Sequence, residues 1–271
     1  GGKEGCPGSM EMQCEPTRGL AVAACVVVVY SAILGLSRCI SPLLAPKTYK
    51  RLLGIPGQAG YWDASVASAI NGIVNTLLAG AIWLRDSSTF MSVDAFVTSE
   101  GTCDVVVIFL TWCCFDLAQC LFYRRLWSDM TATFVHHVSA IAAWSLYLQG
   151  GYGHALSLVG VICEATNPFM NLRWILSACG MKQSVAYMIN GILFVISWML
   201  VRLGFSTYWG IRLIVMQWTS LRTGLPAWRL ALYVGFYAVG VTLNWTWGYK
   251  ILLGTIRMFR SSSSSDKKVS D

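Results

Sequence analysis

Seven ionisable side chains fall within long apolar stretches of this sequence. They are Asp116, His136, His137, Glu164, Arg173, Arg202 and Lys250. Ionisable residues in membrane-spanning segments usually face the interior of a helix bundle, because hydrocarbon leaves a charge without solvation. An imidazole beside a carboxylate can act as a general base, and an imidazole can also accept an acyl group. These residue types therefore predict a polar site inside an apolar protein.

The adjacent histidines, His136 and His137, are the most informative members of this set. Neighbouring residues on a helix point about 100° apart. We therefore expect one ring to face a cavity and the other to pack or hydrogen-bond, and we favour His136 as the inward one. Asp116 is the expected partner on a neighbouring helix. These three residues are the candidate catalytic residues, and a structural ion pair is the alternative that stays open for Asp116 and Glu164.

Long cationic side chains can instead extend along a helix to the membrane surface. For Arg173 and Lys250 this alternative stays open beside a role in binding a headgroup. Arg202, near a predicted helix end, is expected to extend to the surface rather than to belong to the site. Asn167 precedes a proline, which should interrupt the hydrogen bonding of its helix and leave backbone carbonyls free near Glu164.

Apolar segments long enough to cross a bilayer must position these residues. Hydrophobic residues make up 55% of the chain and charged residues 12%, whereas a soluble domain carries about 25% charged residues. A helix needs about 20 mostly apolar residues to cross the hydrocarbon core. The sequence therefore predicts an all-α, multi-pass transmembrane bundle of about seven helices, at roughly 20–44, 64–84, 104–123, 131–149, 154–178, 184–208 and 228–256.

The basic residues of the predicted loops indicate the orientation, since cytosolic loops carry an excess of Lys and Arg. The side that holds the C-terminus carries ten such residues and the opposite side six. We therefore expect a cytosolic C-terminus and a lumenal N-terminus. In this orientation Asp116, His136 and Lys250 each lie about 10 Å below the cytosolic surface by the helical rise. They would form one polar layer.

Composition also argues against two classes of partner. The chain has ten Cys and three His but no CxxC pair, so we expect no metal site. The net charge of +7 is not gathered in a long basic run, so we expect no nucleic-acid partner. No cofactor is expected either.

Two short features bear on the cellular compartment. Cys6, Cys14 and Cys103 share the predicted lumenal side, where disulfides persist. A single disulfide among these three is therefore a hypothesis. Lys267 and Lys268 lie one position away from a dilysine retrieval signal, which favours the endoplasmic reticulum or another endomembrane.

Four segments around these residues resemble the TLC-domain family. Residues 129–138, DMTATFVHHV, resemble its double-histidine segment, and residues 164–174, EATNPFMNLRW, are similar to an E-x-S/T-x-P-F-x-N-x-R-W stretch of its smaller members. Residues 243–251, LNWTWGYKI, resemble its last-helix pattern, and residues 61–71, YWDASVASAIN, look like a fainter copy of W-x-x-R-x-V-S-x-x-H. The shared order and spacing are the specific part of this resemblance.

The family includes ceramide synthases and TRAM-type translocon proteins. The resemblance implies a bundle of six helices, to which the first helix is an addition. It suggests a polar tail over 1–19, a first transmembrane helix over 20–46, a TLC-like domain over 47–260 and a Ser/Lys-rich tail over 261–271.

The chain also departs from the family pattern. Ser65 and Asn71 stand where that pattern has Arg and His. The second His-Asp element of the ceramide synthases is absent or heavily altered. The chain is thus nearer to the non-synthase branch, and N-acyl transfer is in doubt.

Three functions stay open. The leading one is a membrane protein that binds or regulates membrane lipids, as part of lipid homeostasis. Its candidate headgroup-binding residues are Glu164, Asn167, Arg173, Asn244 and Lys250. Whether the protein is an enzyme also stays open. The second function is an N-acyltransferase of the ceramide-synthase type acting on a long-chain base, with acyl-CoA as co-substrate in that case alone. The third is a structural or accessory subunit of a membrane complex. Membrane lipids are the expected partners, and the sequence identifies no protein partner.

Overall fold

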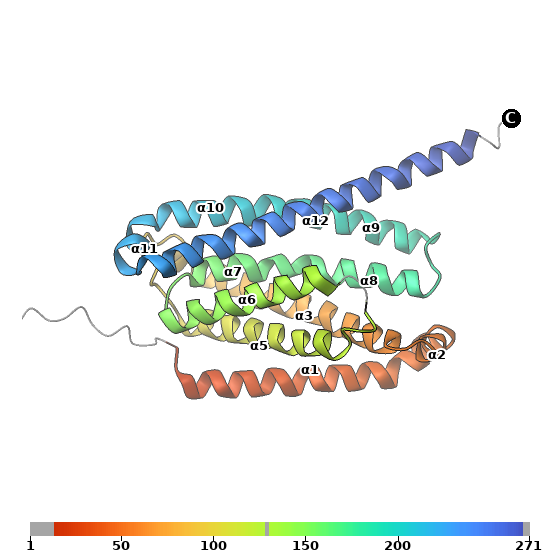
Figure 1. Cartoon of the computed structure of the whole chain (residues 1–271), viewed down its shortest axis with the longest axis horizontal. Coiled ribbons are helices and arrows are strands. Elements are labelled where there is room, and N and C mark those ends of the chain that lie inside the picture. Colours follow the sequence, from red (N-terminus) through yellow and green to blue (C-terminus); the bar gives the residue numbers. More distant parts are fainter. Residues whose placement is uncertain (1–13, 128–129, 268–271) are drawn as a thin grey trace, which may run out of the picture.

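The computed structural model describes residues 14–127 and 130–267, so Cys6 and Lys268 lie outside it. Within these residues the chain is helical and contains no strand. Long helical rods lie side by side in one bundle (Figure 1). Four of these rods are single, uninterrupted helices that follow one another in the chain. They are α1 (Pro16–Leu44), α3 (Gln58–Arg85), α5 (Glu100–Phe122) and α6 (Met130–Gly150). The predicted all-α bundle is confirmed.

Three further rods complete the bundle, and two of them contain irregular turns. The first runs from α7 (His154–Ile162) through a 3₁₀ turn (Cys163–Thr166) to α8 (Asn167–Ala178). The second runs from α9 (Val185–Ser197) through a π-helix (Trp198–Phe205) to α10 (Ser206–Met216). The last is α12 (Ala227–Lys267), which crosses the bundle obliquely and leaves it at its C-terminal end (Figure 1).

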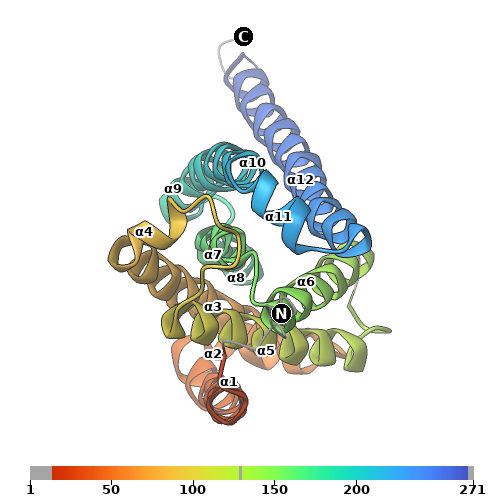
Figure 2. The same ribbon diagram turned by 90° about the vertical axis from the view of Figure 1, so that its left-hand side faces the viewer.

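Short helices lie at the ends of the bundle, where the sequence predicts only loops. They are α2 (Pro46–Leu53), α4 (Ser87–Phe90) and α11 (Trp218–Gly224). Each is far shorter than the length that crosses a bilayer, so a search for apolar spans passes over it. Viewed along the bundle axis, α4 and α11 lie at the end of the bundle where α1 begins (Figure 2).

The outer surface of the bundle is suited to hydrocarbon. Four segments of the described chain are long and apolar enough to cross a membrane, at Pro16–Leu44, Gln58–Arg85, Glu100–Phe122 and Val185–Met216. Only 11% of the most apolar window of α1 is buried by protein, so its apolar side chains face outward. Bulk water would not tolerate so large an apolar surface, and the protein is an integral membrane protein.

A disulfide and a buried hydrogen bond connect the first helix to the rest of the bundle. At one end Cys14 and Cys103 form a disulfide, which is a pair allowed by the sequence hypothesis. Near the middle of α1 the hydroxyl of Tyr30 donates a hydrogen bond to Oδ1 of Asn71 on α3, at 2.7 Å. Both residues are buried. Since hydrocarbon offers no competing partner, this bond fixes the face that α1 presents to α3.

Candidate functional site

A break in the α7–α8 rod positions the buried carboxylate Glu164. Pro168 lacks an amide hydrogen, and its ring clashes with the carbonyl four residues earlier in an α-helix. That carbonyl belongs to Glu164, which lies in the 3₁₀ turn just before the proline. A methyl group added to Gly72 of α3 would lie 2.7 Å from this carbonyl oxygen. Gly72 therefore permits α3 to approach the break closely.

The π-helix of the α9–α10 rod carries Arg202, which faces that break. π-helical segments are rare and often occur at functional sites. The Arg202 side chain donates from Nε to Oγ1 of Thr166 at 2.7 Å, and from Nη1 to Oδ1 of Asn244 at 3.2 Å. Its Nη2 lies 3.5 Å from Oε1 of Glu164. The expectation that Arg202 extends to the membrane surface is wrong, because acceptors from two other rods satisfy it inside the bundle.

A second pair, of the buried His137 and the partly buried Asp116, joins α6 to α5. Nε2 of His137 lies 2.9 Å from Oδ2 of Asp116. His136 points in another direction, with its ring centroid 5.5 Å from that of His137 and in a T-shaped contact with the Trp247 ring of α12, at 5.8 Å. The two rings diverge as expected for neighbours on a helix. The residue that pairs with Asp116 is His137, whereas His136 makes no hydrogen bond within the described chain.

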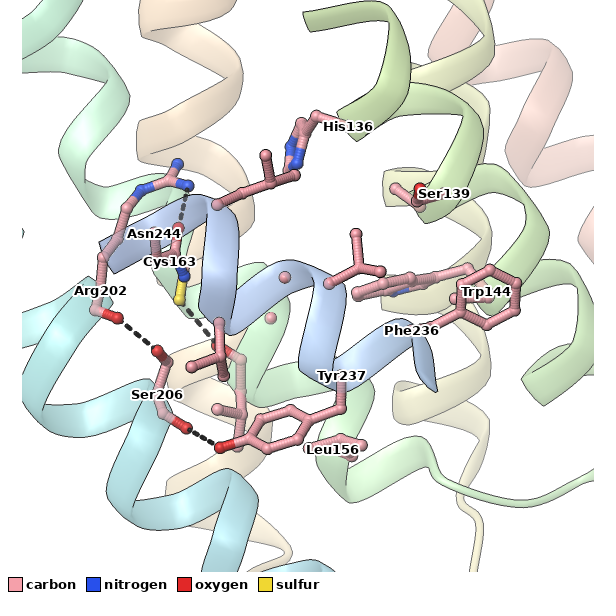
Figure 3. Close-up of a pocket in the computed structure, with 18 of the residues that line it drawn as sticks. His136, Ser139, Trp144, Leu156, Cys163, Arg202, Ser206, Phe236, Tyr237 and Asn244 are labelled. Atoms are coloured by element: carbon pink, nitrogen blue, oxygen red, sulfur yellow. Dashed lines mark hydrogen bonds between the residues drawn. The ribbon is translucent and has the colours of Figure 1, made fainter. Parts of the chain in front are cut away.

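Two cavities meet between these pairs. We call the first the polar chamber, which has a volume of about 1050 Å³ including its opening and whose lining includes Asp116, His137, Asn167 and Lys250. We call the second the apolar chamber, of about 810 Å³ including its opening, whose lining includes Phe109, Ala143, Trp144, Tyr147, Leu156 and Val159. His136, Glu164 and Arg202 line both chambers. Figure 3 shows the apolar chamber, with His136 and Arg202 at one end and Leu156 toward the other.

The structure brings most of the predicted site residues together. Asp116, both histidines, Glu164, Asn167 and Lys250 line the polar chamber, and Asn244 lines the apolar chamber. Arg173 lines neither, and its guanidinium lies 4.2 Å from the centroid of the Tyr187 ring. The predicted roles of these residues stay predictions.

Sequence reasoning assigned Arg202 wrongly and left four aromatic residues of the polar chamber out of its candidate site. Trp112, Phe194, Trp198 and Trp247 line this chamber together with Arg202. The signal for Arg202 was present, since it is a charge within an apolar segment. Trp247 stands in the last-helix pattern that resembles the family, whereas the other three gave no distinct signal, because aromatic residues are common throughout this chain.

Two groups of side chains in the described chain could supply metal ligands. Asp116, Cys120 and His137 offer ligand atoms within 4.8 Å of one another, but the hydrogen bond between the carboxylate and the imidazole already pairs two of them. The other group consists of His154 and the cysteines 14 and 103. A disulfide joins those sulfurs, so they offer no thiolates. The expectation of no metal site stays a prediction.

Comparisons with known proteins agree with this arrangement. The family profile of the TLC domain matches residues 61–253, which begin in α3 and leave α1 outside. The human protein TLC domain-containing protein 4 is 26% identical over 144 residues, which are 52% of this chain and 54% of that relative. The aligned part is thus about half the length of the curated relative. No solved structure matches the chain. Because the profile covers most of its length, the chain belongs to the TLC-domain family.

Proposed function

We propose that this protein binds a membrane lipid, with the headgroup in the polar chamber and an acyl chain in the apolar chamber, and that it acts in lipid homeostasis. The observation that carries the proposal is the junction of the two chambers at His136, Glu164 and Arg202. Sites for small ligands are mostly apolar, with a few converging polar groups. The paired chambers fit that description and match the two parts of an amphipathic molecule.

The length of the apolar chamber suits a single chain. Its first and last lining residues on α6 are His136 and Tyr147, and eleven residues of helix rise about 16 Å. The hydrocarbon core is about 30 Å thick, so this distance is close to the depth of one leaflet. A single acyl chain of an ordinary membrane lipid would extend about as far.

The polar chamber offers both hydrogen-bonding and charged groups to a headgroup. Arg202 is already engaged by four protein acceptors, so it contributes less to a ligand than its charge suggests. His136 is available within the described chain, as is the Asp116 oxygen that does not bond His137. Lys250 is exposed at the mouth. A headgroup that donates hydrogen bonds to Asp116 and carries an anionic group near Lys250 would be complementary.

The orientation and the compartment belong to the same proposal. The excess of basic residues on the side of the C-terminus supports a cytosolic C-terminus. The polar chamber would then open toward the cytosol, in the endoplasmic reticulum or another endomembrane. Protease treatment of tagged protein in sealed microsomes tests this, and a protected C-terminal tag would reverse the orientation.

Native mass spectrometry of the purified protein tests lipid binding. We expect the wild type to retain a lipid, and Ala143→Leu, which adds bulk inside the apolar chamber, to retain less. Ala142→Leu is the matched control, because the neighbouring Ala142 does not line the chamber. A wild-type protein without lipid, or equal retention by both variants, would refute the proposal. A purified protein that carries no lipid, and that also forms no amide from a long-chain base and acyl-CoA, would favour a structural role in a membrane complex.

Acyl transfer is a second candidate, favoured by the Asp116–His137 pair beside His136. In this reaction the amine of a long-chain base attacks the thioester carbonyl of acyl-CoA, the new amide bond forms, and the CoA thiolate leaves. His136 would take the proton from the amine and return it to the thiolate. Acyl-CoA is a co-substrate in this alternative alone, and no cofactor is proposed.

Incubating the purified protein with a long-chain base and acyl-CoA tests this candidate. His136→Ala should abolish amide formation but keep the folded protein. His137→Ala should lower stability by about 1–3 kcal/mol, because the Asp116 carboxylate, whose side chain is 16% exposed, loses its imidazole partner. Amide formation that survives in His136→Ala, or its absence in the wild type, would exclude this mechanism.

A further inference from the structure

The wall of the apolar chamber is closed on one side and thin on another. Leu156 and Val159 of α7 and Phe109 of α5 line it and are almost completely buried. On the opposite side the lining comes from α6 and α12, where Val239 is 39% exposed. Trp144 and Phe236 on these helices are also partly exposed. The chamber therefore approaches the outer surface along the seam between α6 and α12.

Small side chains also line this seam, beside Trp144, Phe236 and Val239. Gly240 of α12 lines the chamber, and a methyl group added to it would meet no heavy atom within 4 Å. Ser139 and Ala140 line the chamber from α6. Toward its C-terminal end α12 also turns away from the other rods (Figures 1 and 2). No large side chain therefore fills the space at Gly240.

The surroundings of the seam are apolar. Val135 of α6 is 43% exposed, and it directly precedes His136, which lines the chamber. This surface faces the bilayer interior if the bundle spans the membrane as proposed. An acyl chain in contact with the seam would already be in hydrocarbon. Each methylene that instead passed through the aqueous mouth of the polar chamber would carry a hydrophobic penalty.

We propose that the seam between α6 and α12 is a lateral portal, through which an acyl chain moves from the bilayer into the apolar chamber. This inference rests on the proposed lipid binding and specifies its route. The chain slides sideways past Gly240 while the headgroup follows along the polar chamber toward His136. The cytosolic mouth, bordered by Met170 and Lys250, then admits the headgroup and water rather than the chain.

Substitutions that narrow either opening distinguish the two routes. Gly240→Leu narrows the seam. Gly235→Leu is the matched control, because Gly235 lies on the same helix, has equally open surroundings and does not line the chamber. Met170→Trp narrows the cytosolic mouth, where Met170 is 42% exposed. The two glycine variants gain the same helix propensity, so a difference between them reports the seam.

The experiment measures how fast a palmitic acid with a diazirine in its chain reaches the chamber. The probe is added to protein in nanodiscs, samples are irradiated at successive times, and labelling near Trp144 and Tyr147 is mapped by peptide mass spectrometry. We expect Gly240→Leu to slow the initial labelling about tenfold, since the helices must separate before the chain can pass. Gly235→Leu and Met170→Trp should label at the wild-type rate.

Two results would overturn the portal. One is labelling of Gly240→Leu at the wild-type rate, and the other is a larger delay in Met170→Trp than in Gly240→Leu. Either result would leave lipid binding intact, because the wild type would still be labelled. Absence of labelling in the wild type would instead reject the proposed function itself.

Discussion

Replacing Arg202 by Met should destabilise the protein strongly, because three buried acceptor residues and one partly buried acceptor residue lose their donor. The side chain is 5% exposed and bonds Thr166, Asn244, Glu164 and Asn167. A neutral hydrogen bond contributes about 1 kcal/mol, and one to a charged group about 1.5–3 kcal/mol. Removing one partner of a buried ion pair costs about 3–5 kcal/mol. We expect a loss of free energy of unfolding in that range.

A variant with both partners replaced distinguishes the contribution of the Arg202–Glu164 ion pair from that of side-chain packing. Glu164→Gln alone should cost a similar amount, since it leaves the guanidinium without its counter-charge. Glu164→Gln combined with Arg202→Met removes both charges, so the double variant should lose no more than either single variant. Unfolding in mixed micelles titrated with sodium dodecyl sulfate measures the three values.

A matched arginine provides the control. Arg173→Met removes a guanidinium that lies over the Tyr187 ring and is partly exposed. Such a contact contributes about 0.5–1 kcal/mol, so this variant should remain close to the wild type. Additive losses in the double variant would refute the reasoning, because independent sites show no coupling. Equal losses for Arg173→Met and Arg202→Met would refute the burial argument.

Two further outcomes can be measured in the same system. Gly72→Ala should lose about 1–3 kcal/mol, since the new methyl would overlap a carbonyl of the 3₁₀ turn, whereas Gly80→Ala on the same helix has open surroundings and should gain about 0.5–1 kcal/mol. Equal effects would contradict the close approach of α3. Peptide mapping without reductant should recover Cys14 linked to Cys103, and Cys14→Ser should cost about 2–4 kcal/mol; two free thiols in the native protein would contradict the linkage.

The helices could be predicted because membrane-spanning segments carry a strong local signal. About 20 consecutive apolar residues are needed to cross the bilayer, and every backbone group within hydrocarbon must be satisfied inside the segment. The predicted helix over 154–178 has the bounds of the observed α7–α8 rod. The predicted interruption near Glu164 also occurs, since Pro168 imposes it locally. Family membership was predictable for a related reason, because its motifs are short and local.

The pairing of the polar side chains could not be read from the sequence. A helix in lipid is apolar on all sides, so no amphipathic stripe marks the face that turns inward. The sequence predicted charges within apolar segments, and it predicted a common level for Asp116, His136 and Lys250, which line one chamber. Only the tertiary structure decided that Arg202 turns toward Glu164, that His137 rather than His136 pairs with Asp116, and that Arg173 stays outside both chambers. These choices depend on acceptors supplied by other helices, and the distances between helices are fixed by packing.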